Sequence, residues 1–528
     1  MRVRCVRVAA AALLVVLAVL PAGCSKRENG QTFSHPNELT IALPEEPVSM
    51  DPLLLEGTLA YTIGDLLYTY LTNYDENGNV VPDVSDVPTP ENGGVSDGGR
   101  RITFHLRHDV KWQDGTPLTS KDVVFTYRAI MNPNNAIPSR YGYDGILKVS
   151  APDAYTVVVQ LKQPFSPIIP QFFGGDSNYP ILPEHVLGKY ASINKVPFNE
   201  APIGSGPYVL KSWTHGDRLV LTANPLYYRG KPAIERLTLP FIHDPATIVN
   251  ELMTGEVDAS FSLDASRISL LRDLAAHRAI VTPIPYFYAL SFNTQDPALA
   301  DADVRRALAM AIDRQAIVRK ISHGVYDPRT GLRGLFTWAF DPNADHIPYD
   351  PQLAKRLLHG KHLQLQLTFP AGSEITTQLA TAIAADEAAI GVTVTLKHDL
   401  REIFIAQDGP VMQGHYQISL YDYHSNYDPD AAWLLACAQR APAGFNDARY
   451  CNPAVDRALQ KASTVYGRSA RSSLYRDVQT RLIGDLPYFF LCQGTEIDVI
   501  PSALQHFERP LLSPFNSVAR WSLGGGGP

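Results

Sequence analysis

The stretch Arg101–Arg128 reads RITFHLRHDVKWQDGTPLTSKDVVFTYR and places three kinds of local structure in direct succession. Its first part alternates polar side chains with the apolar residues Ile102, Phe104 and Leu106. That alternation is typical of a half-buried strand. A turn is predicted at residues 114–117 (DGTP), because glycine permits a positive φ and proline fixes φ. A helix follows, with Thr119 as its N-cap and Asp122 as the acidic half of a capping box.

Five titratable side chains in this stretch could be taken for metal ligands, namely His105, His108, Asp109, Asp114 and Asp122. His105 lies on the polar side of the predicted strand, and the aspartates occupy turn or capping positions. We therefore interpret them as solvated or structural residues, and the stretch predicts no metal site.

The same stretch resembles the signature of the family 5 extracellular solute-binding proteins, the peptide and nickel binders of ABC importers. The matching segments are Leu106-Arg107, Val110-Lys111-Trp112, Asp114-Gly115 and Lys121-Asp122-Val123. Further similarity follows at residues 202–208 (PIGSGPY), 255–258 (GEVD), 292–294 (FNT) and 303–314 (DVRRALAMAIDR). The resemblance implies a two-lobed α/β fold of the periplasmic-binding-protein type II (cluster C), with an additional small domain and a cleft that closes about a hinge.

The resemblance also implies how the chain is divided. We expect lobe I to comprise residues 37–72, 203–285 and 495–528, the accessory domain of lobe I residues 73–202, and lobe II residues 286–494. A chain of 528 residues is too long for one hydrophobic core, which agrees with several domains.

The N-terminus predicts export. Arg2, Arg4 and Arg7 precede an apolar run from Val8 to Leu20 that is short for a membrane span, so residues 1–23 read as a signal peptide. The small residues before Cys24 resemble a lipobox, which implies lipidation of Cys24, although Pro21 stands where an apolar residue is usual. The alternative is ordinary cleavage that releases a soluble exported protein. Residues 24–36 are polar and are expected to form a flexible tether.

Composition excludes some partners. The formal net charge of −7 becomes more negative once the signal segment is removed, which argues against a nucleic-acid partner. No other segment is apolar for long enough to cross a membrane, so the body should be soluble and held at a membrane surface by the lipid. We expect it to be a monomer. Nothing in the sequence predicts a cofactor.

Three cysteines are left after Cys24. Cys437 and Cys451 close a short loop, and a disulfide between them would stabilise an exported protein by roughly 3 kcal/mol. The dipeptide-binding proteins that this chain resembles carry a cysteine pair in the same place. Cys492 lies in an apolar run and is predicted to be a buried free thiol.

The ligand is expected near residues 421–433 (YDYHSNYDPDAAW). The peptide binders of the family place an aspartate, which holds the peptide ammonium, where this chain has Ser425. Either Asp422 or another acid replaces it, or the ligand lacks a free amino terminus. The candidate ligand-binding residues are Tyr421, Asp422, Ser425, Tyr427 and Trp433. Tyr423 is considered with them for stacking, whereas Asp428 before Pro429 is predicted to be the N-cap of the next helix.

Several helices and strands are expected elsewhere. Helices are predicted at 62–71, at 245–254 with Ile248, Leu252 and Met253 inward, and at 303–314 with Arg305, Arg306 and Arg314 solvated. Further helices are expected at 376–389 and 469–484, and strands at 39–43, 155–161, 286–293, 363–369, 392–397, 418–421 and 487–492.

The predicted function is that of a substrate-binding lipoprotein of an ABC importer, which captures an oligopeptide or similar small solute and delivers it to the permease and ATPase complex. Alternatives are an oligosaccharide or nickel-chelate binder, or a sensor or chaperone receptor on the same fold. An extracytoplasmic hydrolase would need a nucleophile with its base or a metal set, and the sequence shows neither constellation.

Overall fold

The computed structural model describes residues 37–524 apart from short gaps at 56, 76–77, 141, 176–178, 265–267, 273, 275, 329–331, 333–337, 342, 345–346, 425–427 and 510–512. The predicted signal peptide (1–23), the tether (24–36) and Cys24 lie outside the described residues.

The stretch quoted at the outset folds as predicted. Strand β5 (Arg101–His105) alternates exposed and buried residues, and Gly115 takes a positive φ of 88° in the turn that follows. Helix α2 (Ser120–Met131) begins with a capping box, in which the Asp122 carboxylate accepts a 2.8 Å hydrogen bond from the backbone N–H of Thr119. The structure therefore confirms the strand, the turn and the capped helix.

A small four-stranded sheet surrounds this stretch. The strand order is β4 (Val95–Ser96), β5, β7 (Thr156–Leu161) and β6 (Ile146–Asp153), with antiparallel neighbours throughout. The two segments predicted as alternating strands pair with each other, since β5 lies against β7. Helix α2 covers one face of the sheet and Trp112 is fully buried beneath it. We call this part of the molecule the accessory domain.

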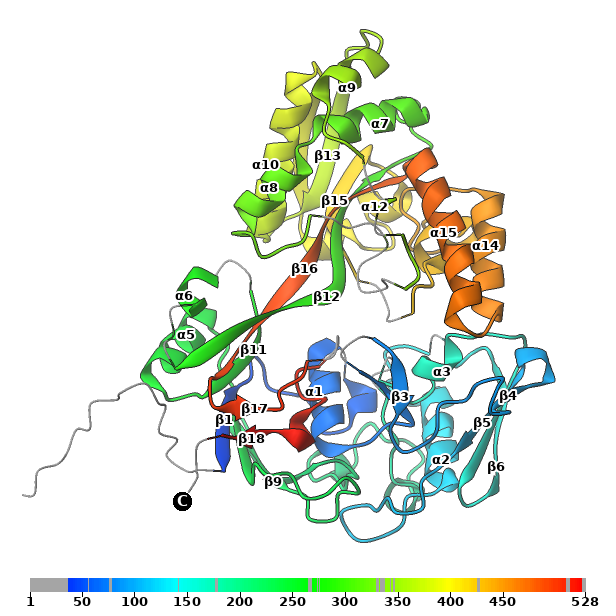
Figure 1. Ribbon diagram of the computed structural model, residues 1–528, viewed down its shortest axis with the longest axis vertical. Helices are drawn as coiled ribbons and strands as arrows, with labels where there is room; N and C mark the ends of the chain where they lie inside the picture. The colour runs from blue at the N-terminus through cyan, green and yellow to red at the C-terminus, as the bar shows by residue number, and fades with distance from the viewer. Residues whose placement is uncertain are drawn as a thin grey trace, which may run out of the picture.

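A ten-stranded sheet runs through the rest of the molecule in the order β14-β13-β15-β12-β16-β11-β1-β10-β9-β8. One end of it, together with the helices packed there, forms the upper body in Figure 1, which we call lobe II. The other end forms the lower body, lobe I, with the accessory domain beside it. The strands of the lobe I end are β1 (Glu38–Ala42), β8 (Tyr208–Thr214), β9 (Arg218–Ala223), β10 (Arg236–Pro240) and β11 (Ala259–Leu263).

Two long antiparallel strands connect the lobes. Strand β12 (His277–Phe292) pairs with β16 (Tyr488–Pro501) along most of their lengths, and Figure 1 shows them passing from one body to the other. The predicted strands at 286–293 and 487–492 are only the lobe II ends of these elements. Pro283 weakens the strand signal in the connecting part, and the pairing register shifts between Pro283 and Phe287. Such a two-strand connection is the natural place for a hinge between the lobes.

Lobe II places helices on both sides of its strands. Its strands are β13 (Gln364–Pro370), β14 (Thr393–Asp399) and β15 (Ile418–His424). Its helices are α7 (Ala302–Ala311), α8 (Arg314–Ile321), α9 (Pro351–Leu357), α10 (Glu374–Ala389), α11 (Arg401–Phe404), α12 (Pro410–Gln413), α13 (Ala432–Leu435), α14 (Pro453–Thr464) and α15 (Arg468–Asp485). The alternation of strands and helices confirms the predicted mixed α/β lobe.

The remaining elements are short. They are the strands β2 (Thr72–Tyr74), β3 (Val80–Pro82), β17 (Leu504–Gln505) and β18 (Ser522–Leu523), and the helices α1 (Gly57–Leu67), α3 (Ile168–Gln171), α4 (Glu184–Leu187), α5 (Pro245–Thr254) and α6 (Ile268–Arg272). No helix in the described part of the chain is both long and apolar enough to cross a membrane.

Three helix predictions are wrong in detail. Helix α1 ends at Leu67, not at 71, because residues 72–74 pair as strand β2. Met253 is 64% exposed and does not belong to the inward face of α5. The helix expected at 303–314 ends at Ala311, because Asp313 caps a new helix, α8.

Arg305 is also not solvated. Its guanidinium is buried and donates hydrogen bonds to the backbone carbonyl groups of Leu299, Ala300, Asp485 and Leu486. Two of these acceptors, Asp485 and Leu486, lie 180 and 181 residues away along the chain, which the helical periodicity of a single segment does not reveal.

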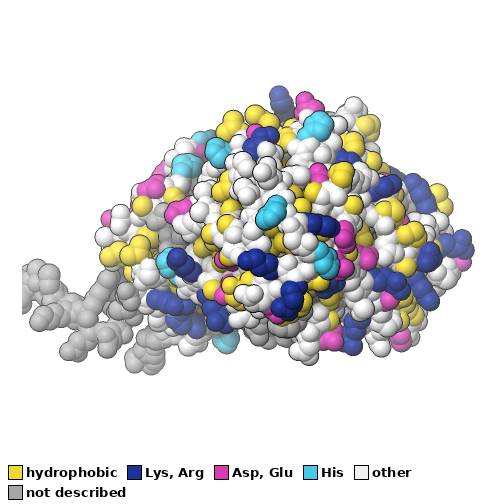
Figure 2. Space-filling view, turned by 90° about the horizontal axis from the view of Figure 1, so that it is seen from above, with side chains coloured by type: hydrophobic (Ala, Val, Ile, Leu, Met, Phe, Trp, Pro, Cys, Tyr) yellow, Lys and Arg dark blue, Asp and Glu magenta, His cyan; other side chains and the backbone are white. Residues whose placement is uncertain are grey.

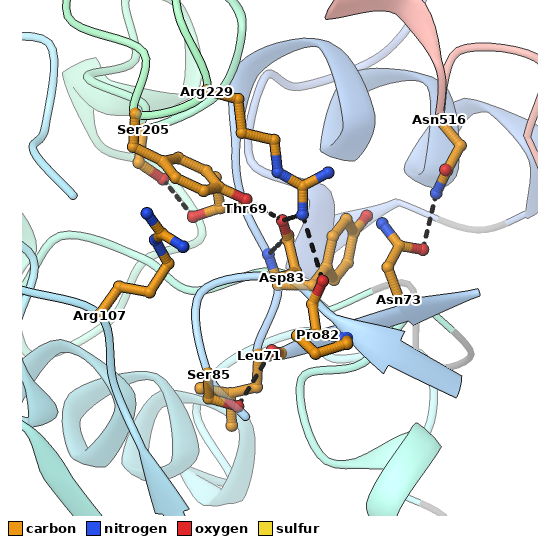
Figure 3. A network of polar contacts seen from close by, with 12 residues as sticks. Thr69, Leu71, Asn73, Pro82, Asp83, Ser85, Arg107, Ser205, Arg229 and Asn516 are labelled. Atoms are coloured by element: carbon orange, nitrogen blue, oxygen red, sulfur yellow. Dashed lines mark hydrogen bonds and ion pairs between the residues drawn. The ribbon is translucent and has the colours of Figure 1, made fainter. Parts of the chain in front are cut away.

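The accessory domain is fixed to lobe I by a polar network (Figure 3). The buried Asp83 carboxylate accepts hydrogen bonds from the backbone N–H of Tyr70 at 2.9 Å, from Arg229 at 2.8 Å and from the hydroxyl of Tyr228. Arg107, from the stretch quoted first, lies 5.0 Å from the Tyr228 ring centre. Two further bonds lie close by, between Thr69 and Ser205 and between Asn516 and Asn73. Because the buried Asp83 carboxylate would lose three hydrogen-bond donors if the network opened, we expect the accessory domain and lobe I to move as one body.

Candidate functional site

The candidate site lies where three parallel strands of lobe II end. Strand β13 runs parallel to both β14 and β15, so the carboxyl ends of all three meet at one edge of the sheet. Ligands of open α/β sheets bind outside the carboxyl ends of the strands. Strand β12 runs antiparallel to β15 and brings Tyr286 opposite His424 and Tyr288 opposite Asp422. This edge carries the first part of the predicted ligand segment.

Asp422 is held by a bidentate ion pair. Arg401 donates from its two terminal nitrogens to the two carboxylate oxygens, at 2.8 and 3.2 Å, and His424 Nε2 lies 3.1 Å from Oδ2. Burial acts to raise the pKa of Asp422, but the hydrogen bonds of His424 and Arg401 and the guanidinium charge outweigh it. The pKa of Asp422 therefore lies below its ordinary value, and the carboxylate stays ionised.

The tyrosines of β15 lie on its other face. The Tyr421 ring packs against Phe404 and Tyr423, with ring centres 5.2 and 4.1 Å away. Tyr423 is buried, and its hydroxyl donates to the Asp447 carboxylate at 2.9 Å. Tyr423 is thus a core residue, whereas Tyr421 is half-buried at the same edge.

Asp428 does not cap a helix, which corrects the prediction. Helix α13 begins after Ala431, which makes no side-chain capping bond. The Asp428 carboxylate instead accepts two hydrogen bonds from Arg471, and both side chains are less than 10% exposed. Arg471 lies forty-three residues further along the chain, so the local cap-then-proline pattern could not show this pair.

The remaining predicted residues fall into two groups. Ser425 and Tyr427 lie outside the described residues. Trp433 lies on α13, is half-buried, and packs against the part of the lobe II core that contains Leu434 and Tyr423. The structure therefore brings Tyr421 and Asp422 to the strand edge and leaves Trp433 in helix packing.

A cavity of about 390 Å³ lies between lobe II and the accessory domain. On the lobe II side it is lined by Trp338, Asp428 and the turn between α14 and α15. In that turn, Arg468 donates to the backbone carbonyl of Gly78 at 2.7 Å and to the side chain of Asn79. The Tyr466 hydroxyl donates to the carbonyl of Gly99 at 2.8 Å, and the backbone N–H of Ser166 donates to the carbonyl of Ser463 at 2.6 Å. We call these four hydrogen bonds the interlobe contact.

The chain matches the model of the bacterial extracellular solute-binding proteins, family 5 (middle), over residues 89–444. The chain belongs to this family. Protein XP55 of Streptomyces lividans is 32% identical over 76% of this chain and 74% of that protein. Oligopeptide-binding protein AppA of Bacillus subtilis is 24% identical over 97% of both chains. The crystal structure of NikZ from Campylobacter jejuni with Ni(L-His) has a TM-score of 0.71 and 24% identity, and covers 92% of this chain and all of NikZ, which shows a shared fold.

Membership of family 5 confirms the resemblance drawn from Arg101–Arg128 and the two-lobed fold. It also makes this chain a member of an extracellular solute-binding family, a class defined by binding. Among the described residues, no group of three or more histidine, cysteine or carboxylate side chains could hold a metal ion. His359 and His362 are both exposed. Figure 2 shows lobe II from above, where histidines and charges of both signs are scattered over the surface.

Two cysteines of this family 5 protein form a disulfide, and a third is buried. Cys437 and Cys451 are joined by a disulfide, and Cys492 is free and buried. Burial raises the pKa of the Cys492 thiol, so it stays protonated and unreactive at neutral pH.

Sequence reasoning missed Arg401. Arg401 follows β14 by two residues, on the first turn of the short helix α11. Its partner Asp422 is 21 residues away, so no local motif links the two. The available signal was the order of strands, because residues after successive parallel strands meet at one sheet edge.

Proposed function

We propose that this chain is the extracytoplasmic receptor of an ABC importer, which captures an oligopeptide or a similar small polar solute between its lobes and delivers it to the membrane permease and ATPase. The observation that carries the proposal is the strand edge of lobe II, which faces lobe I and is joined to it by the β12–β16 connection and the interlobe contact. Relatives named for oligopeptide binding support the peptide as the first ligand class.

Thermal-shift screening of the purified chain tests this proposal with peptides, sugars and nickel complexes. Because a ligand that binds only the folded state stabilises it by mass action, a peptide at 100 times its Kd should add about 2.7 kcal/mol. A shift with a glycan or a metal chelate and none with peptides would replace the peptide with that ligand class.

We also propose that the ligand contacts the 421–433 segment, with Tyr421, Asp422, Ser425, Tyr427 and Trp433 as candidates. The position of Asp422 and half-buried Tyr421 at the strand edge supports this placement. An unchanged Kd in Asp422→Ala would remove that residue from the site.

We further propose that the protein is a lipoprotein, and that its acylated Cys24 holds the folded body at the outer face of a membrane. The n-region, the apolar run and the small residues before Cys24 support it. Labelling cells with a radioactive fatty acid tests it, because label on the wild type should disappear in Cys24→Ser. An unlabelled wild-type protein would instead indicate ordinary signal cleavage and a free exported receptor.

A further inference from the structure

The carboxylates of Asp422 and Asp428, in the predicted ligand segment 421–433, already have hydrogen-bond partners. Both Asp422 oxygens accept hydrogen bonds from Arg401, and His424 lies against one of them. Both Asp428 oxygens accept hydrogen bonds from Arg471 in a buried pair. A ligand ammonium at either carboxylate would compete with a guanidinium for oxygens that already accept its hydrogen bonds.

Asp430 and Asp447 offer no better ammonium site. Asp430 accepts a hydrogen bond from the backbone N–H of Ala432, and burial with the nearby Asp428 charge raises its pKa to about 6. Asp447 is 1% exposed and accepts hydrogen bonds from the hydroxyls of Ser419, Tyr423 and Tyr488. Both carboxylates serve the packing of lobe II.

Arg401, unlike these carboxylates, is exposed and has hydrogen-bonding groups to spare. Its side chain is 45% exposed, against 16% for its partner Asp422. A guanidinium carries five N–H donors in a planar fork, and the ion pair with Asp422 uses two of them. The remaining donors are available to a second acceptor, and the bidentate pair holds the guanidinium in one orientation. An arginine held in this way by a carboxylate is preorganised to bind an anion.

Apolar side chains flank this arginine on its own short segment. Leu400 is 62% exposed and Ile403 is 52% exposed, one on each side of Arg401 along the chain. Water covers more than half of each of these two aliphatic side chains. They gain free energy when an apolar group of a ligand covers them.

We propose that Arg401 anchors the ligand by a carboxylate group, and that Leu400 and Ile403 receive an apolar side chain next to that carboxylate. This inference rests on the proposed function and narrows it to a peptide held by its carboxyl end instead of by its ammonium. Glu402 adjoins Arg401, Asp399 is paired with Lys397 at 3.3 Å, and Asp422 offsets the Arg401 charge. Binding therefore depends on directed hydrogen bonds more than on net charge, and its salt dependence should be weak.

Isothermal titration of the full chain with three forms of one leucine-containing tripeptide tests the proposal. The forms have both ends free, an acetylated N-terminus, or an amidated C-terminus. Acetylation should change Kd less than about 3-fold, whereas amidation should weaken binding at least about 10-fold, because it removes a charge-assisted hydrogen-bond acceptor.

The variants complete a thermodynamic cycle. Arg401→Gln should weaken binding of the free peptide by about the same factor and leave binding of the amidated peptide unchanged. Arg401→Gln combined with Asp422→Asn removes the unpaired carboxylate and should show the same loss, which separates ligand contact from damage to the fold. Arg476→Gln, at an exposed arginine of α15, is the control and should leave the preference for the free carboxylate intact.

The outcomes separate this inference from the proposed function. If peptides bind but Arg401→Gln leaves Kd unchanged, or if acetylation rather than amidation abolishes binding, the carboxylate anchor is overturned while the receptor function stands. If no form of any peptide binds, the carboxylate anchor and the peptide as ligand class are both overturned, and the screen with sugars and nickel complexes decides whether the receptor function stands.

Discussion

Asp422 and Asp428 lie six residues apart, and each is held by two hydrogen bonds from one arginine, yet their surroundings differ. The Asp428–Arg471 pair is closed off from water, with side chains 6% and 9% exposed. The Asp422–Arg401 pair leaves the arginine 45% exposed at the edge of the sheet. An aspartate–arginine pair that is closed off from water stabilises packing. A pair of the same kind whose arginine stays exposed keeps N–H donors that can bind a ligand.

The buried pair also supports the interlobe contact. The Arg471 guanidinium lies 5.7 Å from the centre of the Trp338 ring, and Arg468 lies 5.1 Å from the same ring. Arg468 then reaches the accessory domain at Gly78 and Asn79. The Asp428 side of the segment therefore supports the contact between the lobes, while the Asp422 side carries the proposed ligand anchor.

The largest expected effect is that of Asp428→Ala. Removing this carboxylate leaves the Arg471 charge buried without a partner, so the free energy of unfolding should fall by about 3–5 kcal/mol. Urea denaturation measures the loss. Asp428→Leu combined with Arg471→Met should recover part of the stability, because no unpaired charge is left. A loss below about 1 kcal/mol in Asp428→Ala would contradict a structural role for this pair.

The second-largest expected effect on stability is the loss of the disulfide between Cys437 and Cys451, which follows Asp428 in the chain. Replacing Cys437 and Cys451 together with serine should lower the free energy of unfolding by about 3 kcal/mol, because the disulfide closes a loop with a sequence separation of 14 residues. Dithiothreitol should lower the thermal midpoint of the wild type and leave that of the double variant unchanged. Equal sensitivity of both proteins to the reductant would argue against this prediction.

Asp422→Asn should have a smaller effect with a defined pH dependence. The pKa of Asp422 is lower in the folded protein than the ordinary value near 3.9, so its stabilising contribution is present above about pH 4. That contribution is lost as the pH falls toward the folded-state pKa. The variant should be about 1 kcal/mol less stable than the wild type at pH 7, and the difference should shrink toward pH 2. A difference that stays constant over this range would contradict the assignment.

Asp430→Asn should act in the opposite direction. Burial, reinforced by the Asp428 charge, raises the folded pKa of Asp430 to about 6. The stability that comes from keeping this carboxyl group protonated is therefore fully present below about pH 4, and it is lost as the pH rises through 6. An asparagine can keep the hydrogen bond from Ala432 without a charge. The variant should gain about 1 kcal/mol at pH 8 and nothing at pH 4, as measured by denaturation at both values. Lower stability of the variant at pH 8 would rule out this reading.

Arg468→Ala should change stability least. Its side chain is exposed, so the loss should be at most about 0.5 kcal/mol, but the interlobe contact weakens and bound ligand should dissociate a few times faster. Stopped-flow dissociation measures the rate. Arg476→Ala, an exposed arginine on the same helix, is the control and should leave the rate unchanged. Identical rates in both variants would mean that the contact does not hold the lobes together.

The segment from Arg101 to Arg128 was predictable because every feature in it depends on near neighbours. Thr119 caps through Asp122, and Gly115 turns within four residues, so spacing alone determines the outcome. The lobe II strands and the long helices α10 and α15 were likewise found from periodicity. Arg305 was predicted to be solvated and Met253 to face inward, and both predictions were wrong. How the helices pack decides that carbonyl groups surround Arg305 and that no surface covers Met253.

By itself, the sequence determined the family and the mixed α/β lobes, since these follow from local periodicity and ordered motifs. Only the tertiary structure decided which carboxylates of residues 421–433 form ion pairs. Asp422 pairs with Arg401, 21 residues away, and Asp428 pairs with Arg471, 43 residues away. The physical reason is that an ion pair depends on distance in space and on exclusion of water. Both are set by strand order and helix packing, which lie beyond the reach of any local pattern.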